Sequence, residues 1–169
     1  MSDSGFYIRP ATGSSEDIDA IIRLVKELAI YEKSEDKAKA TPELMKQNLF
    51  TTPFAHALLA FSPAGQAVGL ALYFFNFSTW TGRPGLYLED LFVQPEFRNK
   101  GVGKAFFAEL AKIAQEKNCA RMDWAVLNWN TPSIDFYEKV LGAKAMSEWM
   151  GMRLEEDGIE SLKKFSINQ

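Results

Sequence analysis

The chain of 169 residues is poor in the residue types on which many common active sites depend. It has one cysteine, Cys119, so no disulfide can form within the chain, and a lone cysteine of this kind usually packs as a small apolar residue. It has one histidine, His56, which argues against a zinc site and against a Ser-His-Asp triad. His56 stands in the apolar run TTPFAHALLAF, where we expect a packed or surface side chain. We therefore expect no metal site.

The sequence also lacks long apolar runs and a strong excess of one charge. No run approaches the about 20 apolar residues of a membrane helix, and the N-terminal MSDSGFYIRP has no apolar signal core. We therefore expect a soluble, cytoplasmic protein without a membrane partner. The 19 basic and 22 acidic residues give a net charge of −3, which argues against a nucleic-acid partner. The length fits one ordinary domain and no repeat or linker interrupts it, so we expect a single domain over residues 1–169.

What the sequence does contain is an ordered succession of strand-like and helix-like segments. Apolar residues recur at helical spacing within residues 18–29, after Ser14 or Ser15 as a helix cap, and Thr41 followed by Pro42 predicts the start of another helix. Strands are predicted at residues 6–11, 56–62, 67–78, 85–93, 120–127 and 150–156, and helices at 14–36, 41–50, 102–118 and within 128–143. This order predicts an α+β fold with a mixed sheet and helices on both faces.

Glycines stand directly before the third predicted helix, in FRNKGVGKAFFAEL at residues 97–110. Such glycines can form a phosphate site, because backbone N–H groups and the positive end of the helix converge on the phosphate oxygens. Two familiar phosphate loops do not fit this stretch. A Walker loop needs a hydroxyl after Gly103 and Lys104, but Ala105 follows, and a dinucleotide-binding loop needs a third glycine where Phe106 stands.

A third pattern, [RQ]-x-x-G-x-[GA], is met by Arg98, Gly101 and Gly103, and here the chain resembles the GNAT acetyltransferase superfamily. In that family the loop binds the pyrophosphate of coenzyme A. The chain resembles the diamine acetyltransferase branch in particular, over nearly its whole length and in the same segment order. The resembling segments are IRPAT at 8–12, LVKELAIYE at 24–32, STWTGR at 78–83, YLEDLFVQPEFRNKGVG at 87–103, AVLNWNTPSIDFYEKVLGA at 125–143 and GMRL at 151–154.

The resemblance implies the GNAT acyl-CoA N-acyltransferase fold and an enzyme that transfers an acetyl group from acetyl-CoA to a primary amine of a small molecule. This reaction must remove a proton from the amine, hold the oxyanion and return a proton to the thiolate. Glu89 matches the family's base, which acts directly or through water, and Tyr137 matches the acid that protonates the coenzyme sulfur. Neighbours on a strand point to opposite faces, so Asp90 is expected to face away from Glu89.

The remaining site residues follow from the same resemblance. Predicted coenzyme contacts are Leu91, Phe92, Val93, Arg98, Asn99, Lys100, Gly101, Val102, Gly103, Lys104, Asn130, Ser133, Tyr137 and Lys139. The backbone of Leu91 to Val93 is expected to pair with the pantetheine arm, and the N–H of Leu91 or Phe92 to donate to the oxyanion. Predicted amine contacts are Glu32, Ser78, Thr79, Trp80, Glu89, Asp90 and Leu127, and no metal is expected.

Substrate and assembly are predicted from the branch that the chain resembles. Its polyamine enzymes tend to carry one acid in place of Ser78 and another near Met150, so a lysine-like amine such as thialysine is favoured over spermidine. The branch pairs through late strands, and EWMGMRL offers apolar residues there, so we expect a homodimer. Two alternatives stay open, namely a peptide or protein N-acetyltransferase and a non-catalytic module that binds coenzyme A.

Overall fold

The computed structural model describes residues 5–167. The first residues of MSDSGFYIRP, on which the expectation about a signal segment partly rests, lie outside this range. The chain forms two compact units, one reaching to Leu127 and one starting at Asn128.

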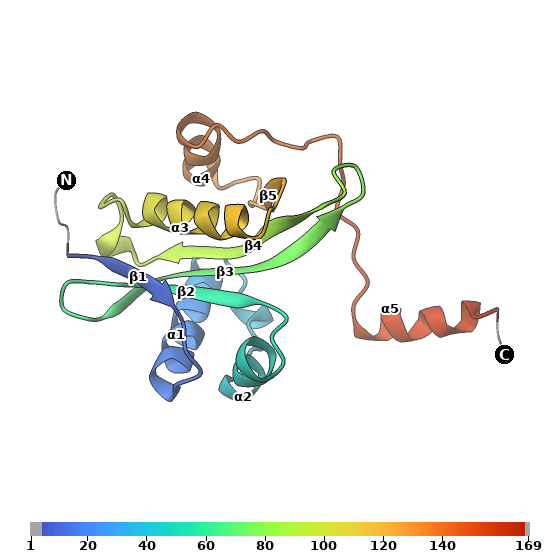
Figure 1. The fold of residues 1–169 in the computed structure, drawn as a ribbon. Helices are drawn as coiled ribbons and strands as arrows, with labels where there is room; N and C mark the ends of the chain where they lie inside the picture. Colours follow the sequence, from blue (N-terminus) through green and yellow to red (C-terminus); the bar gives the residue numbers. More distant parts are fainter. Residues whose placement is uncertain (1–4, 168–169) are drawn as a thin grey trace. The chain divides into compact units, whose positions relative to one another are not determined.

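The first unit is built around a five-stranded sheet in the order β1-β2-β3-β4-β5 (Figure 1). The strands are β1 (Tyr7–Pro10), β2 (His56–Phe61), β3 (Ala67–Ser78), β4 (Arg83–Val93) and β5 (Arg121–Trp124). Neighbouring strands from β1 to β4 are antiparallel, and β4 and β5 are parallel. The sheet is therefore mixed, as the sequence predicts.

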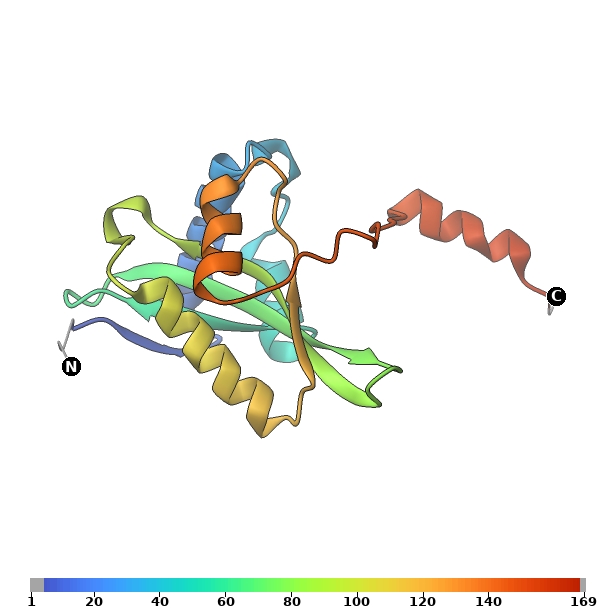
Figure 2. The ribbon, with the colours of Figure 1, turned by 90° about the horizontal axis from the view of Figure 1, so that it is seen from above.

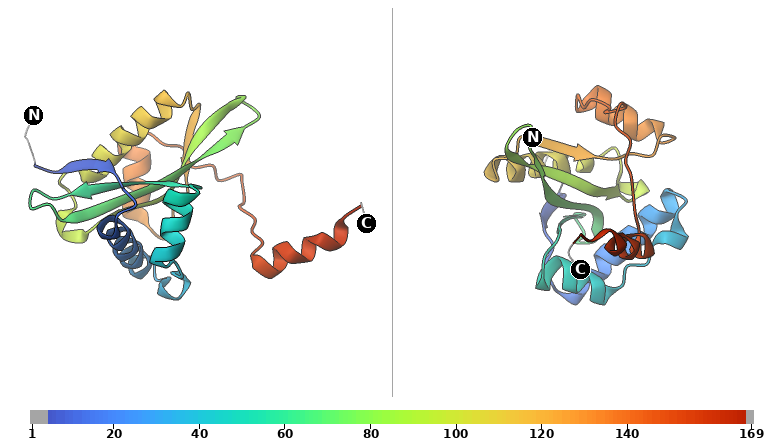
Figure 3. Two further views of the ribbon diagram at one scale, coloured as in Figure 1. Left: turned by 60° about the horizontal axis from the view of Figure 1, so that its bottom comes forward. Right: turned by 90° about the vertical axis from the view of Figure 1, so that its right-hand side faces the viewer.

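Helices cover the two faces of this sheet. The long helix α1 (Ser15–Tyr31) and the short α2 (Pro42–Lys46) lie on one face, and α3 (Val102–Glu116) runs across the other (Figures 1, 2 and 3). Each face has its own apolar core. Ile21, Leu24 and Leu28 of α1 pack against Leu59 and Leu70, among others, on one side. The other core packs the sheet against Val102, Phe106, Leu110 and Ala114 of α3. These two cores hold the site-bearing strand β4 between the helix layers.

The ends of the helices follow local sequence signals. The Ser14 hydroxyl accepts the N–H of Asp17 at the start of α1, and the Thr41 hydroxyl accepts that of Leu44 at the start of α2, which confirms both predicted caps. Short helical turns follow at Glu35–Lys37, Gln47–Thr51 and Pro95–Phe97. Helix α1 ends at Tyr31, earlier than the predicted residue 36, because Lys33 adopts a left-handed conformation (φ 56°).

The second unit contains α4 (Thr131–Asp135), a wider helical turn at Phe136–Val140, α5 (Glu156–Ser161) and a tight turn at Leu162–Phe165. The strand predicted at residues 150–156 is wrong, because this stretch has no regular structure before α5. A strand needs a hydrogen-bonded neighbour, and within residues 5–167 no strand pairs with this stretch. Its alternating apolar side chains are instead exposed, by 83% at Met150 and 87% at Met152.

Candidate active site

The predicted catalytic carboxylate, Glu89, lies at a bulge in β4. Leu88 pairs with Tyr73 and Asp90 pairs with the adjacent Leu72, so Glu89 is an extra residue in the ladder. The bulge changes which face the following side chains meet. Leu88 belongs to the core on the α3 face, whereas Asp90 stands opposite Leu72, a member of the core on the α1 face. Simple alternation therefore fails here, and the sequence has no glycine at this point that could have signalled the bulge.

Beyond the bulge, the edge of β4 that faces β5 is open. The parallel pairing of β4 with β5 runs only from Gly85–Arg121 to Leu88–Trp124, whereas β4 continues to Val93. Among the described residues, no strand pairs with this edge beyond Leu88. The backbone groups of residues 91–93 on that side can therefore bond an extended ligand, as predicted for the pantetheine arm.

Three carboxylates gather near the bulge. Burial, followed by the charges of Glu89 and Glu32, raises the pKa of Asp90 to about 6. Burial also raises the pKa of Glu32, which follows the last residue of α1. Burial and the charges of Glu89 and Asp123 raise the pKa of Tyr87. An ammonium group placed among these carboxylates would offset both the burial and the mutual repulsion of the negative charges.

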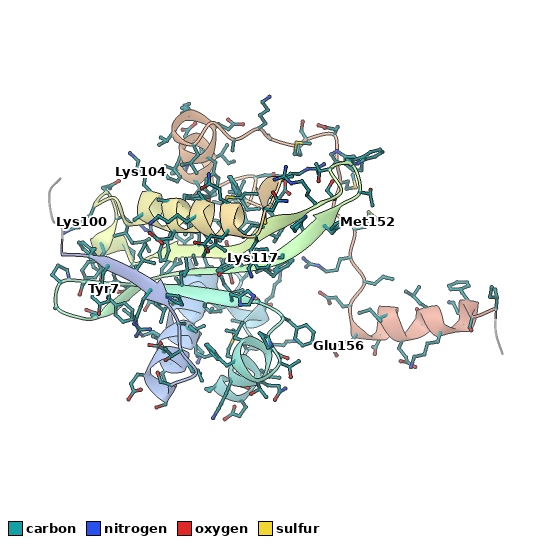
Figure 4. All side chains as sticks on the ribbon, viewed as in Figure 1. Tyr7, Lys100, Lys104, Lys117, Met152 and Glu156 are labelled. Atoms are coloured by element: carbon teal, nitrogen blue, oxygen red, sulfur yellow. The ribbon has the colours of Figure 1, made fainter. Side chains whose placement is uncertain are left out.

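The predicted phosphate loop lies at the N-terminal end of α3. Asn99 (φ 60°) and Gly101 (φ 86°) are left-handed, and no side chain caps the helix, so its first N–H groups are not bonded by a cap residue. A Cβ added at Gly103 would meet no atom within 4 Å, so packing within the chain does not require glycine there. Lys100 and Lys104 are exposed at this end of the helix (Figure 4). These features fit an anion that approaches the backbone closely.

The Arg98 side chain is directed elsewhere. Its Nε–H donates to the carbonyl oxygen of Val93 (2.8 Å). The guanidinium carbon lies 5.0 Å from the ring centroid of Tyr31 in α1 and 5.6 Å from that of Phe92. The sequence pattern places Arg98 in the loop, but it does not say where this long side chain turns.

The predicted amine contacts do not all lie together. Ser78 pairs with Arg83 at the far end of β3, six residues beyond Leu72, which pairs with Asp90. At 3.3 Å per residue, Ser78 is about 20 Å along the strand from the carboxylates. Trp80 at this hairpin tip is 84% exposed. Within one copy of the first unit, the hairpin tip and the carboxylates therefore do not form one pocket.

The second unit carries the other predicted coenzyme residues. The Asn130 side chain caps α4 by accepting the N–H of Ser133 (3.4 Å), and Asn130 is buried. Tyr137 follows α4, with its ring 5.8 Å from that of Phe136. The Lys139 ammonium lies 2.8 Å from the Asp135 carboxylate, and this contact raises the pKa of Lys139. The helical turn therefore positions Tyr137 and Lys139 through local contacts.

A cavity of about 240 Å³ lies between β1 and the start of α3. It is lined by Phe6, Tyr7, Ile8, Lys100, Gly101, Val102, Ala105 and Glu109. Tyr7 and Lys100 mark its position in Figure 4. None of the three carboxylates at the bulge lines this cavity.

Within residues 5–167, no group of three His, Cys, Asp or Glu side chains is arranged to hold a metal ion. No helix in this range has both the length and the apolar character needed to span a membrane.

Comparisons with known proteins identify the family. The profile of the Acetyltransferase (GNAT) family matches residues 21–143. The chain is 40% identical over 157 residues to the thialysine N-epsilon-acetyltransferase of Bos taurus, covering 86% of this chain and 91% of that protein. It is 31% identical over 129 residues to the thialysine N-epsilon-acetyltransferase of Caenorhabditis elegans, covering 76% and 79%.

A solved structure agrees with the fold. The chain superposes on an integron cassette protein from the mobile metagenome of V. cholerae with a TM-score of 0.77 and 27% identity, covering 95% of this chain and 98% of the other. The predicted fold class and the resemblance drawn from the loop are thereby confirmed. The chain belongs to the GNAT family of acetyltransferases.

Proposed function

We propose that this chain transfers an acetyl group from acetyl-CoA to the primary amine of a small molecule. The observation that carries the proposal is the carboxylate cluster of Glu32, Glu89 and Asp90 beside the open edge of β4. An amine arrives as a cation, and the negative charge gathered around the partly buried Asp90 attracts it. The names of the relatives agree, since they include thialysine N-epsilon-acetyltransferases and an L-ornithine N5-acetyltransferase of Arabidopsis thaliana, which is 35% identical over 99 residues.

Acetyl-CoA is the proposed co-substrate, and no metal takes part. The loop from Arg98 to Lys104 would bind the pyrophosphate through its backbone, with added charge from Lys100 and Lys104. The backbone of residues 91–93 would bond the pantetheine arm. Asn130, Ser133, Tyr137 and Lys139 of the second unit would complete the coenzyme site. The family profile spans both units, which supports their action as a single domain over residues 1–169.

The reaction proceeds by direct attack within a ternary complex. Glu89, directly or through a water, takes a proton from the bound ammonium. The neutral amine nitrogen then forms a bond to the acetyl carbon, and the oxyanion accepts the N–H of Leu91 or Phe92. As the oxyanion collapses and the carbon–sulfur bond breaks, the Tyr137 phenol gives its proton to the departing sulfur. The nitrogen then loses its second proton, which restores the phenol, so the products are a neutral amide and the coenzyme thiol. Asp90 holds the amine beside Glu89.

The proposed amine is a lysine-like amino acid such as thialysine, in preference to a polyamine. Ser78 and Met150 are neutral, so the carboxylates that would hold a second ammonium group are missing there. Leu127 remains a proposed contact for the rest of the amine, whereas Ser78, Thr79 and Trp80 could reach the same amine only from the second copy of the proposed homodimer, because the hairpin tip is about 20 Å along β3 from Asp90. The alternatives are transfer to a peptide or protein, and coenzyme binding without chemistry.

A homodimer in the cytoplasm is the proposed state. Exposed apolar side chains of the second unit support an interface, with Trp149 71% exposed, beside the exposed Met150 and Met152. Light scattering should give twice the chain mass of 19.0 kDa at micromolar concentration. A mass of one chain would contradict the dimer.

The decisive experiment offers acetyl-CoA with separate panels of amines. Thialysine, ornithine, spermidine and short peptides are compared by the release of free coenzyme thiol. A higher kcat/KM for thialysine than for spermidine supports the substrate proposal. Preference for peptides would favour the alternative enzyme, and coenzyme binding without turnover of any amine would favour the binding module.

A further inference from the structure

One face of α1 is joined to the segment that follows β4 by two matched contacts. On α1 the residues are Glu27 and Tyr31, one helical turn apart. On the segment after β4 they are Gln94 and Arg98, which are also four residues apart and flank the turn at Pro95–Phe97. Gln94 contacts Glu27, and Arg98 contacts Tyr31.

The first contact is a buried hydrogen-bonded anchor. Gln94 is only 7% exposed, and its Nε2 donates to both carboxylate oxygens of Glu27 (3.1 and 3.0 Å). Arg23, one turn earlier on α1, donates to Glu27 (3.2 Å) and to the carbonyl oxygen of Ala67 (2.8 Å). This part of α1 is thereby tied both to the start of β3 and to the end of β4.

The second contact is the cation–π arrangement of Arg98. Its guanidinium lies over the Tyr31 ring while its Nε–H is bonded to Val93, so the side chain bridges β4 and the last residue of α1. The next residue, Glu32, is one of the three carboxylates at the bulge. The chain turns away from the helix at the left-handed Lys33, and the N–H of the following Ser34 donates to the carbonyl oxygen of Ala29 (2.8 Å).

We propose that Arg98 is a positioning residue that joins the coenzyme loop to the amine-binding carboxylates through Tyr31. The backbone of Arg98 opens the loop, and its side chain fixes the helix end that carries Glu32. Occupancy of the loop by coenzyme A then holds Glu32 in place for the amine, and by linkage the amine favours the loop conformation that binds the coenzyme. This inference rests on the proposed function for the identity of the two ligands.

A role as phosphate ligand makes a different prediction. If the guanidinium held the pyrophosphate, loss of Arg98 would weaken coenzyme binding in a salt-dependent way, and Tyr31 would not matter. If Arg98 positions the end of α1, removal of the Tyr31 ring has the same effect as removal of Arg98. That effect falls on the KM for the amine.

The first test is a double-mutant cycle with steady-state kinetics on thialysine. Tyr31→Leu and Arg98→Ala should each raise the KM for thialysine about fivefold, the effect of one partly exposed cation–π contact. The double variant should do no worse than either single variant, because both remove one contact. Tyr31→Phe keeps the ring and should behave as wild type. Additive effects, or an unchanged thialysine KM in Tyr31→Leu, would overturn the inference.

The second test does not need turnover. Amide hydrogen exchange at residues 32–34 is measured with and without free coenzyme A, in wild type and in Tyr31→Leu. The coenzyme should slow exchange there in wild type but not in the variant, although calorimetry shows both proteins loaded with coenzyme. Equal protection in both loaded proteins would overturn the inference. A wild-type chain that binds no coenzyme A would instead overturn the proposed function.

Discussion

Two carboxylates, Asp17 at the start of α1 and Asp90 on β4, have pKa values that are shifted in opposite directions. At the start of the helix, Asp17 is 4% exposed and accepts two bonds from the Arg9 guanidinium (2.7 and 2.9 Å) and two from Thr12 (2.7 and 2.8 Å). The bond from Arg9 outweighs burial and lowers the pKa of Asp17 to about 2. Past the end of the helix, burial and neighbouring carboxylates raise the pKa of Asp90 to about 6.

The difference separates a structural carboxylate from a functional one. The fold supplies Asp17 with a cation and donors, so its charge stabilises the folded state at neutral pH. The fold partly buries Asp90 and places two further carboxylates near it, so at pH 7 its ionisation costs folding free energy. The ionised Asp90 lowers the stability of the free protein, and a bound ammonium group would offset this cost. Such a site is suited to an ammonium substrate.

The largest expected effect is that of Asp90→Asn. Loss of a charge-assisted contact to the amine should lower kcat/KM for thialysine about 10- to 100-fold, equivalent to about 1.5–3 kcal/mol. The folded pKa of Asp90 lies above the unfolded value, so the ionised group weakens the fold above pH 6. Urea unfolding at pH 7 should therefore show a variant that is more stable than wild type by about 1–3 kcal/mol. A variant both inactive and less stable would break the comparison.

Asp17→Asn should have the converse outcome. It leaves Arg9 without its carboxylate partner and should lower the free energy of unfolding at pH 7 by about 2–3 kcal/mol. Acetyl transfer per folded molecule should not change, because Asp17 is at the other end of α1. Asp19→Asn is the matched control on the same helix, since Asp19 is exposed and should change the free energy of unfolding by less than about 0.5 kcal/mol. Equal losses in the two variants would remove the special role of Asp17.

The pH dependence of the wild type should separate the two groups without mutation. Asp17 has a lowered folded pKa, so its stabilisation is complete above about pH 4 and is lost as pH falls toward 2. Asp90 should lose its charge as pH falls through about 6. The thialysine kcat/KM should fall about tenfold from pH 7 to 5 beyond the decline due to the amine's own titration, while the fold stays intact. Loss of activity and of near-ultraviolet circular dichroism at one pH would contradict this separation.

Much of this architecture could be predicted from the sequence because its signals are local. The caps at Ser14 and Thr41, and the glycines before α3, act over three or four residues. The bulge at Glu89 could not be predicted, because it depends on how β4 registers with β3. For the same reason, the distance between Ser78 and Asp90 becomes apparent only once the strands are paired.

Other predictions failed because they depend on contacts between elements that are distant in the sequence. The alternation of Met150, Met152 and Leu154 is typical of a strand, yet no neighbouring strand pairs with it among the described residues. The direction of the Arg98 side chain depends on where Tyr31 and Phe92 lie in space. Residue type and spacing place a side chain on an element, whereas the packing of distant elements decides what that side chain contacts.

The smallest expected effect is that of Glu32→Gln, which tests how much Glu32 contributes to the raised pKa of Asp90. Glu32→Gln removes the weaker of the two carboxylate charges that raise the pKa of Asp90, while burial and Glu89 continue to raise it. The pKa of Asp90 should move down, and the acidic fall in kcat/KM should shift to lower pH. The KM for thialysine should rise about fivefold, because one charge near the ammonium is lost. Glu16→Gln, an exposed glutamate at the start of α1, should leave both unchanged. If Glu32→Gln lowers kcat/KM but the acidic fall of its pH profile stays at the same pH, then Glu32 contacts the amine but lies too far from Asp90 to affect its ionisation.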